Sequence, residues 1–209
     1  MMLKIYNKHY FTAMLNVYAC TKEYLRTFVF SLDLYVIKDN RHLKLTQKLN
    51  NMNFYIRRAT PSDVNEIFEL HVHTIQSISH KYYSVEQLAS WSERLTQVRY
   101  LAAIDEKIVF VACEEYSDRV LGFAQLDQKR CWIDACYVLP DQERQGIGHA
   151  LLQHLEQEAQ QLRITALNLN ASLNAHTFYA KAGYVKLQDD VHWFSSGASI
   201  PCVLMQKKF

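Results

Sequence analysis

The stretch Pro140-Asp-Gln-Glu-Arg-Gln-Gly-Ile-Gly-His-Ala-Leu-Leu152 decides how this chain folds and what it holds. A strand-like apolar run, Cys131–Leu139, precedes it, and a strong helix is predicted from Ala150 to Leu162. Two glycines one residue apart at a strand-to-helix turn let the backbone curl tightly and expose several N–H groups. The start of the helix adds unpaired N–H groups and a partial positive charge. The segment therefore predicts a cradle for an anion such as a phosphate or pyrophosphate.

Two common phosphate loops do not fit this segment. The dinucleotide fingerprint Gly-x-Gly-x-x-Gly fails because its third glycine position holds Leu151. The nucleoside-triphosphate loop fails because the chain contains no Gly-Lys-Ser/Thr triplet. What remains is Arg/Gln-x-x-Gly-x-Gly followed by a Leu-Leu helix, and the alternative is a glycine-rich helix start that binds no ligand.

A second segment, Leu167–Tyr184, predicts a strand end, a short helix and a glycine stop. Leu167 and Leu169 alternate with asparagines, which is typical of a strand, whereas Ala175, Phe178 and Ala182 recur at helical spacing. Gly183 then supplies a C-terminal stop for the helix.

Both segments resemble the GNAT superfamily of acetyl-CoA-dependent N-acetyltransferases. The first resembles its pyrophosphate loop, and the run Ala175-x-x-Phe-Tyr-x-Lys-x-Gly183-Tyr184 resembles its signature about 30 residues later. The resemblance spans about residues 53–207. It implies an α/β fold with a mixed, mostly antiparallel sheet of about seven strands, splayed at the fourth and fifth strands and flanked by about four helices.

Local patterns place the elements along the chain. We expect strands over residues 54–58, 107–114, 120–126, 132–138, 166–170, 184–187 and 201–206. We expect helices from residue 61 to about 79, over 85–93 with Ser84 as cap, from Ala150 to Leu162, and over 175–182.

The resemblance also implies how acetyl-CoA is held. Backbone groups of Cys136, Tyr137 and Val138 would pair with the pantetheine arm, and the backbone N–H groups of the loop would bind the pyrophosphate; the loop residues are Arg144, Gln145, Gly146, Ile147, Gly148 and His149. Glu143 stands where the family loop opens with Gln or Arg, so we expect Glu143 to turn outward and Arg144 to carry the charge contact. Ser172 stands where the family often has asparagine, so Asn174 or Asn170 is expected to contact the coenzyme instead.

For the reaction, the resemblance assigns Tyr179 as the acid that protonates the departing thiolate; the alternative is a core aromatic residue. Asp134 is the candidate for the group that accepts the amine proton, since alternation would place it on the strand face of Cys136. Other candidates are His71, His73, His80, Glu114 and Glu115. No cysteine-histidine order supports a covalent mechanism, and the resemblance implies direct transfer.

Composition excludes several classes of protein. With 49% hydrophobic and 21% charged residues, the chain is typical of a globular protein. It contains no run of 18 apolar residues, and its five cysteines match no zinc motif, so we expect no membrane span, no metal and reduced thiols in the cytoplasm.

The first 52 residues differ from the remainder. They contain neither glycine nor proline and carry eight basic against three acidic residues, 8 − 3 = +5. Since the whole chain is +2, residues 53–209 carry −3. We expect a GNAT acyltransferase domain over 53–209 and an extension over 1–52, which is either a start-site artefact or a basic appendage.

The predicted function is transfer of an acetyl group from acetyl-CoA to a primary amine of a small molecule or peptide. The alternatives are a non-catalytic acyl-CoA-binding regulatory module and an acetyltransferase acting on an RNA-linked amine. The −3 charge of the domain argues against nucleic acid as a partner. The sequence does not decide between a monomer and a homodimer.

Overall fold

A computed structural model of the chain describes residues 53–209. The predicted extension, residues 1–52, lies outside them. The described part contains a seven-stranded sheet in the order β1-β2-β3-β4-β5-β7-β6. Its strands are β1 (Phe54–Arg58), β2 (Ile108–Glu114), β3 (Val120–Asp127), β4 (Trp132–Val138), β5 (Ala166–Ser172), β6 (Val185–Trp193) and β7 (Ser199–Lys208).

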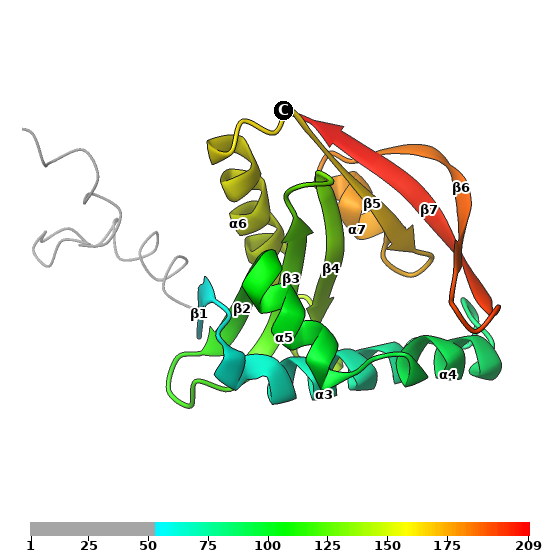
Figure 1. Cartoon of the computed structure of the whole chain (residues 1–209), viewed down its shortest axis with the longest axis horizontal. Coiled ribbons are helices and arrows are strands. Elements are labelled where there is room, and N and C mark those ends of the chain that lie inside the picture. The colour runs from blue at the N-terminus through cyan, green and yellow to red at the C-terminus, as the bar shows by residue number, and fades with distance from the viewer. Residues whose placement is uncertain (1–52) are drawn as a thin grey trace, which may run out of the picture. The chain divides into compact units, whose positions relative to one another are not determined.

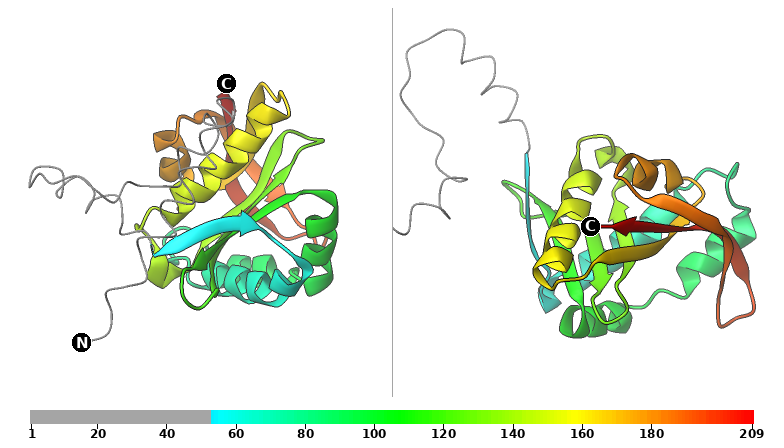
Figure 2. Two further views of the ribbon diagram at one scale, coloured as in Figure 1. Left: turned by 90° about the vertical axis from the view of Figure 1, so that its left-hand side faces the viewer. Right: turned by 90° about the horizontal axis from the view of Figure 1, so that it is seen from above.

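Helices cover both faces of this sheet (Figures 1 and 2). They are α3 (Val64–Gln76), α4 (Val85–Glu93), α5 (Gln97–Glu106), α6 (Ile147–Gln161) and α7 (His176–Lys181), with short 3₁₀ turns η2 (Pro61–Asp63) and η3 (Pro140–Gln142). The predicted α/β fold with about seven strands is therefore confirmed, and residues 53–209 contain five α-helices where about four were expected.

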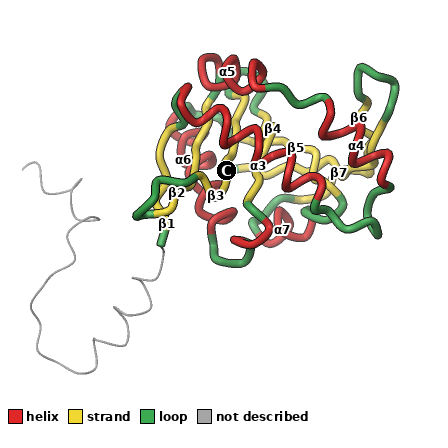
Figure 3. Tube along the Cα trace, turned by 90° about the horizontal axis from the view of Figure 1, so that it is seen from below, coloured by secondary structure: helices red, strands yellow, loops and turns green. Residues whose placement is uncertain are grey.

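The sheet separates two hydrophobic clusters. The first contains Leu151, Leu152 and Leu155 of α6 together with Tyr179 of α7. The second contains Ile67 and Ile75 of α3 and the aromatic side chains of α4 and α5. Seen from below, α5 and α7 accordingly lie on opposite sides of the strands (Figure 3). The buried apolar side chains of α3 and α6 pack these two helices against opposite faces of the sheet.

Strands β4 and β5 meet at one end and separate at the other (Figure 1). All other neighbours in the sheet are antiparallel, but β4 and β5 are parallel and share a single residue pair, Trp132 with Asn168. From Ile133 onward, β4 pairs only with β3. One edge of β4 therefore presents backbone N–H and C=O groups that no neighbouring strand satisfies, and the splay predicted from the family resemblance is confirmed.

A bulge interrupts β4 next to this split. Gln125 of β3 pairs with Ala135, but the next residue, Leu126, pairs with Ile133, so Asp134 is the extra residue. A bulge shifts the alternation of side chains by one position. Ile133 and Cys136 consequently both belong to the α6 side, which simple alternation would forbid.

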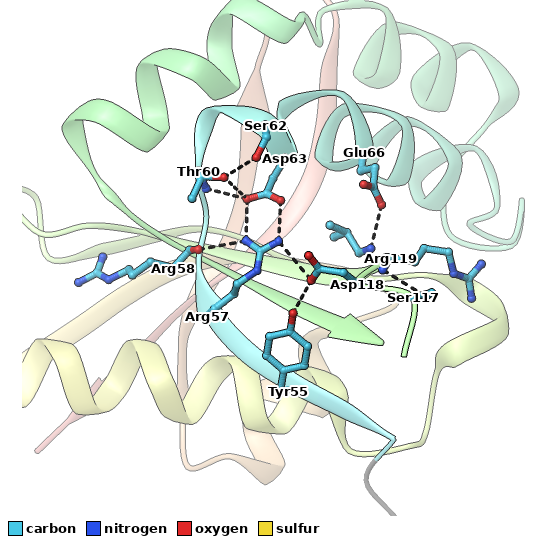
Figure 4. Close-up of polar contacts among 11 residues, drawn as sticks. Tyr55, Arg57, Arg58, Thr60, Ser62, Asp63, Glu66, Ser117, Asp118 and Arg119 are labelled. Carbon is cyan, nitrogen blue, oxygen red and sulfur yellow. Dashed lines mark hydrogen bonds and ion pairs between the residues drawn. The ribbon is translucent and has the colours of Figure 1, made fainter. Parts of the chain in front are cut away.

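A polar network fastens β1 to the start of α3 and to the β2–β3 turn (Figure 4). Arg57 donates from both terminal nitrogens to the Asp63 carboxylate, each at 2.8 Å. Asp63 also accepts from the backbone N–H of Thr60 at 2.6 Å, which caps the helical turn that begins at Pro61. Although burial opposes it, these hydrogen bonds hold the pKa of Asp63 below its ordinary value. On the other side, Tyr55 and Arg57 both contact Asp118.

The structure differs from the predicted elements in two places. Helix α5 was not predicted, because only Tyr100 and Ala103 of its ten residues are buried and they form no apolar stripe. The strand predicted over residues 184–187 ends too early, because residues 188–193 also belong to it. β6 runs to Trp193 and pairs with β7 through a tight turn, although most of β6 is exposed and its pattern does not alternate.

Candidate active site

A pocket of about 890 Å³ passes through the gap between β4 and β5. On the α6 side it is lined by the β4–α6 loop, by β5 and by α7, whereas on the other side it is lined by α3, α4 and α5. The two sides have different constructions. The first side presents mainly a backbone edge and a glycine loop, and the second presents side chains that are far apart in the sequence.

The loop after β4 has the backbone conformation that the paired glycines predict. Gly146 has a φ of +86° and is the N-cap of α6, and Arg144, not a glycine, also has a positive φ of +62°. Left-handed residues in a loop before a helix turn successive N–H groups toward one concave surface. Arg144, Gly146, Gly148 and His149 line the pocket, and so does Glu143.

Two residues of the predicted loop, Gln145 and Ile147, do not place their side chains in the pocket. Ile147 is 1% exposed and belongs to the core under α6. The amide of Gln145 donates to Gln142 within the same loop at 3.1 Å. Neither side chain lines the pocket, so both could act on a ligand only through the backbone.

The predicted pantetheine residues lie along the free edge of β4. Cys136, Tyr137 and Val138 all line the pocket. On the neighbouring strand β3, a Cβ at Gly122 would come within 2.8 Å of the Tyr137 carbonyl oxygen. The glycine therefore lets β3 approach the strand segment that has the open edge.

Polar residues on and just after β5 line the same pocket. Asn170, Ser172 and Asn174 all line it. The Oδ1 atom of Asn170 is buried and has no hydrogen-bond partner among residues 53–209. A buried amide oxygen without a partner is costly, and a ligand N–H group would satisfy it.

Tyr179 lies in α7 with its side chain 7% exposed and lines the pocket. Its ring packs edge-on against Phe178 and Tyr184, at centroid distances of 5.0 and 5.7 Å. Burial, with smaller contributions from Cys136, Tyr137 and Tyr184, raises the pKa of Tyr179 well above its ordinary value. The hydroxyl is therefore protonated throughout the physiological range, and it donates to no other group in the described part of the chain.

Asp134 also lines the pocket, but it does not share the face of Cys136 as was expected. Its Oδ2 accepts from Lys107 Nζ at 2.7 Å and from Gln125 Nε2 at 2.8 Å, and both residues lie on the α3–α5 side of the sheet. The face prediction is wrong because the bulge at Asp134 breaks the alternation. Both contacts use Oδ2, which leaves Oδ1 without a hydrogen bond from residues 53–209.

Of the other predicted proton acceptors, only His71 lines the pocket; His73, His80, Glu114 and Glu115 do not. His71 is 7% exposed, its Nδ1 lies 2.8 Å from the Tyr100 hydroxyl, and its ring packs at a tilt against that of Tyr137, with 3.9 Å between the ring centres. Burial and the positive charges of Arg94 and Arg99 lower the pKa of His71 to about 3. The imidazole is therefore neutral at physiological pH.

The cysteine near the site is a poor nucleophile. Burial raises the pKa of the Cys136 thiol to about 12, so its thiolate form is scarce at neutral pH. Residues 53–209 contain no cluster of three His, Cys, Asp or Glu side chains that could hold a metal ion. No helix in that same range is long and apolar enough to cross a membrane.

Several pocket residues were missed by the sequence analysis, namely Trp91, Arg94, Arg99 and Tyr100. They belong to α4, to the residue that ends it and to α5. No local motif marks them, because nothing in their spacing indicates that they meet β4, more than 30 residues later.

Comparison with known proteins identifies the family. The family described as "Acetyltransferase (GNAT) domain" matches residues 79–209. The chain therefore belongs to the GNAT acetyltransferases. Over 132 residues it is 24% identical to "Uncharacterized N-acetyltransferase YafP" of Escherichia coli (strain K12), covering 63% of this chain and 81% of that protein.

Solved structures share the fold. A GCN5-related N-acetyltransferase from Rhodopseudomonas palustris is 27% identical, with a TM-score of 0.69, over 74% of this chain and 95% of that one. The PaiA N-acetyltransferase of Thermoplasma acidophilum, solved with coenzyme A, is 19% identical with a TM-score of 0.61, over 76% and 100%. The yncA protein of Salmonella typhimurium, solved with acetyl-CoA, is 20% identical with a TM-score of 0.56, over 75% and 94%.

Proposed function

We propose that this protein transfers the acetyl group of acetyl-CoA directly to a primary amine of a small molecule or peptide, and that residues 53–209 form the acyltransferase domain. The observation that carries the proposal is the pocket at the β4–β5 split. There, an open strand edge, a left-handed glycine loop and a buried tyrosine hydroxyl meet. The binding of coenzyme A or acetyl-CoA by two proteins of the same fold supports it.

The donor would be held mainly by backbone groups. The free edge of Cys136, Tyr137 and Val138 offers the N–H and C=O pattern that the amides of an extended pantetheine arm require. The N–H groups of Arg144 to His149 would bind the pyrophosphate, with Arg144 adding charge. Asn174 lines the pocket, and Asn170 offers its unpaired Oδ1 to an amide of the arm.

The transfer itself requires a neutral amine to attack the thioester carbonyl. The resulting tetrahedral oxyanion then expels the coenzyme A thiolate, and a proton must reach that sulfur. We assign this proton to Tyr179, whose hydroxyl is protonated and has no competing acceptor among residues 53–209. The tyrosinate left behind is then reprotonated from solvent, because its pKa is high.

The proton released by the amine needs a different acceptor. His71 is unsuited to that role, because burial and the charges of Arg94 and Arg99 disfavour the imidazolium that it would become on accepting the proton. We assign the role to Asp134, whose Oδ1 is free to accept the proton through water while Lys107 and Gln125 hold Oδ2. Direct transfer is favoured over an acyl-cysteine intermediate because the Cys136 thiol is protonated at neutral pH.

Release of free thiol from acetyl-CoA, measured over a panel of amines with the full chain, tests this proposal. We expect amine-dependent release together with the N-acetylated amine in equal amount. If acetyl-CoA binds but no amine yields thiol, the protein is a binding module instead. If thiol release requires aminoacylated RNA and falls steeply with salt, the RNA-linked acceptor is correct.

A further inference from the structure

The half of the pocket opposite the coenzyme loop contains two arginines without an acidic partner. Arg94, which ends α4, and Arg99, in the first turn of α5, both line the pocket. Neither forms an ion pair with any side chain of residues 53–209. Arg94 is half-buried against the ring of Phe194, 4.6 Å from its centre, and its Nε atom is buried without a hydrogen-bond partner.

The acidic side chains of the pocket do not neutralise this pair. They are Glu106, Asp134 and Glu143. Asp134 is bound by Lys107, and Glu143 lies in the loop after β4. Glu106 lies at the other end of α5 from Arg99 and forms no ion pair with either arginine. The first turn of α5, which carries Arg99, contains no acidic residue.

The positive charge of the two arginines also affects the pKa values of neighbouring ionisable groups. Burial is the largest influence on His71 and His192, and the two arginines lower both pKa values further; Asp190 opposes this only at His192. Burial lowers the pKa of Arg94 itself, and Arg99 adds to the effect. Keeping two cations together in a partly buried pocket is unfavourable unless an anion joins them.

A neutral hydrogen-bonding group lies in the same region. His71 is nine-tenths buried, and its Nδ1 is engaged by Tyr100, whereas its Nε2 has no partner within residues 53–209. A buried ring nitrogen left unpaired is the kind of polar atom that a ligand completes.

Resting on the proposed transfer to an amine, we propose that the acceptor is an amino acid-like amine whose anionic group, a carboxylate or a phosphate, binds between Arg94 and Arg99. Arginine suits this role because its planar fork matches the two oxygens of such an anion. The anion at the arginines would orient the acceptor with its amine toward the β4–β5 split, where the thioester lies.

Matched ligands test this specificity. With the full chain and saturating coenzyme A, we would compare the melting-temperature shifts produced by amino acids, their carboxamides and the corresponding decarboxylated amines, and measure kcat/KM for the same sets with acetyl-CoA. We expect a free acid to exceed its carboxamide by about 10–100-fold in affinity and in kcat/KM, the range of one hydrogen-bonded charge contact. A greater effect of an amine phosphate would retain the site and identify the anion as phosphate.

Variants make the test specific. Arg94→Gln and, independently, the exposed Arg99→Gln should remove most of the preference for the acid over its carboxamide. Arg119→Gln, an exposed arginine outside the pocket, is the matched control and should keep the preference. Equal binding of acids and carboxamides by the unmodified chain, no binding of any acid, or an unchanged preference in both variants would overturn the proposal.

Binding and turnover also separate this inference from the proposed function. Acids that bind but are never acetylated would contradict the proposed transfer and support the anion site. Acetylation confined to neutral amines would support the transfer and contradict the anion site.

Discussion

The two halves of the pocket are built in opposite ways. The half that we propose for the coenzyme, the coenzyme half, is continuous in sequence, since β4, its loop and α6 follow one another, and it presents mainly backbone N–H and C=O groups. The acceptor half joins side chains of α3, α4 and α5 to a strand that follows them in the chain. Backbone recognition depends on conformation and tolerates many side chains, whereas side-chain recognition changes with each substitution. This difference explains how one fold can keep its donor and vary its acceptor.

The largest effect is expected where the two halves meet. Tyr179→Phe should lower kcat by about 10²–10⁴, the usual contribution of one acid–base group. Coenzyme affinity should change little, because that half binds through the backbone. Steady-state kinetics together with calorimetric binding of coenzyme A would measure both quantities.

Tyr184→Phe is the matched control for this prediction. Tyr184 packs against the Tyr179 ring and is buried, but it does not line the pocket. Its variant should keep normal turnover. If Tyr179→Phe also turns over normally, then water or another residue protonates the thiolate, and Tyr179 is a packing residue.

A smaller effect is expected from the conformation of the coenzyme loop. Gly146→Val places a β-branched residue at a φ of +86°, which should cost about 1–3 kcal/mol of stability and distort the anion cradle. Affinity for acetyl-CoA should fall in parallel, as measured by calorimetric titration of the folded variant.

Gly197 provides a comparison with nearly the same backbone. Its φ is +84°, a Cβ there also meets no atom within 4 Å, and the residue lies in the β6–β7 turn outside the pocket. Gly197→Val should lose similar stability and bind acetyl-CoA normally. Equal losses of affinity in the two variants would mean that general destabilisation, and not the loop, is responsible.

The acceptor half should respond to pH through His71. Its pKa is about 3 when folded and about 6.5 when unfolded, so between these values the unfolded chain binds more protons. The free energy of unfolding should therefore fall as pH drops from 6.5 toward 3, by at most about 1.4 kcal/mol per pH unit from this group.

Denaturant unfolding at several pH values would measure that slope. His71→Gln should reduce it, whereas His73→Gln, an exposed histidine of the same helix, should leave it unchanged. Identical slopes in all three proteins would show that His71 is already protonated, and therefore solvated, in the folded state.

The coenzyme half could be predicted from the sequence because its signals are local. The strand Trp132–Val138 has the predicted bounds, and the paired glycines predicted the turn into α6. The position of Asp134 could not be predicted, because a bulge is a property of strand pairing. Nor could the presence of His71, Arg94 and Arg99 in one pocket with Tyr137 be predicted, because it depends on how three helices pack against the sheet.

The smallest effect is expected from removing residues 1–52. All seven strands of the described sheet lie between Phe54 and Lys208, so a 53–209 chain should keep the melting temperature and acetyl-CoA affinity of the full chain. Both can be measured on purified proteins. An insoluble 53–209 chain beside a soluble full chain would contradict the proposed domain boundary.

Calorimetric titration of the full chain with acetyl-CoA tests the central claim most directly. We predict saturable binding of one acetyl-CoA per chain, retained in Tyr179→Phe and in Arg94→Gln and weakened in Gly146→Val, because the loop and strand backbone hold the donor. A folded full chain that shows no binding at millimolar acetyl-CoA would contradict the account.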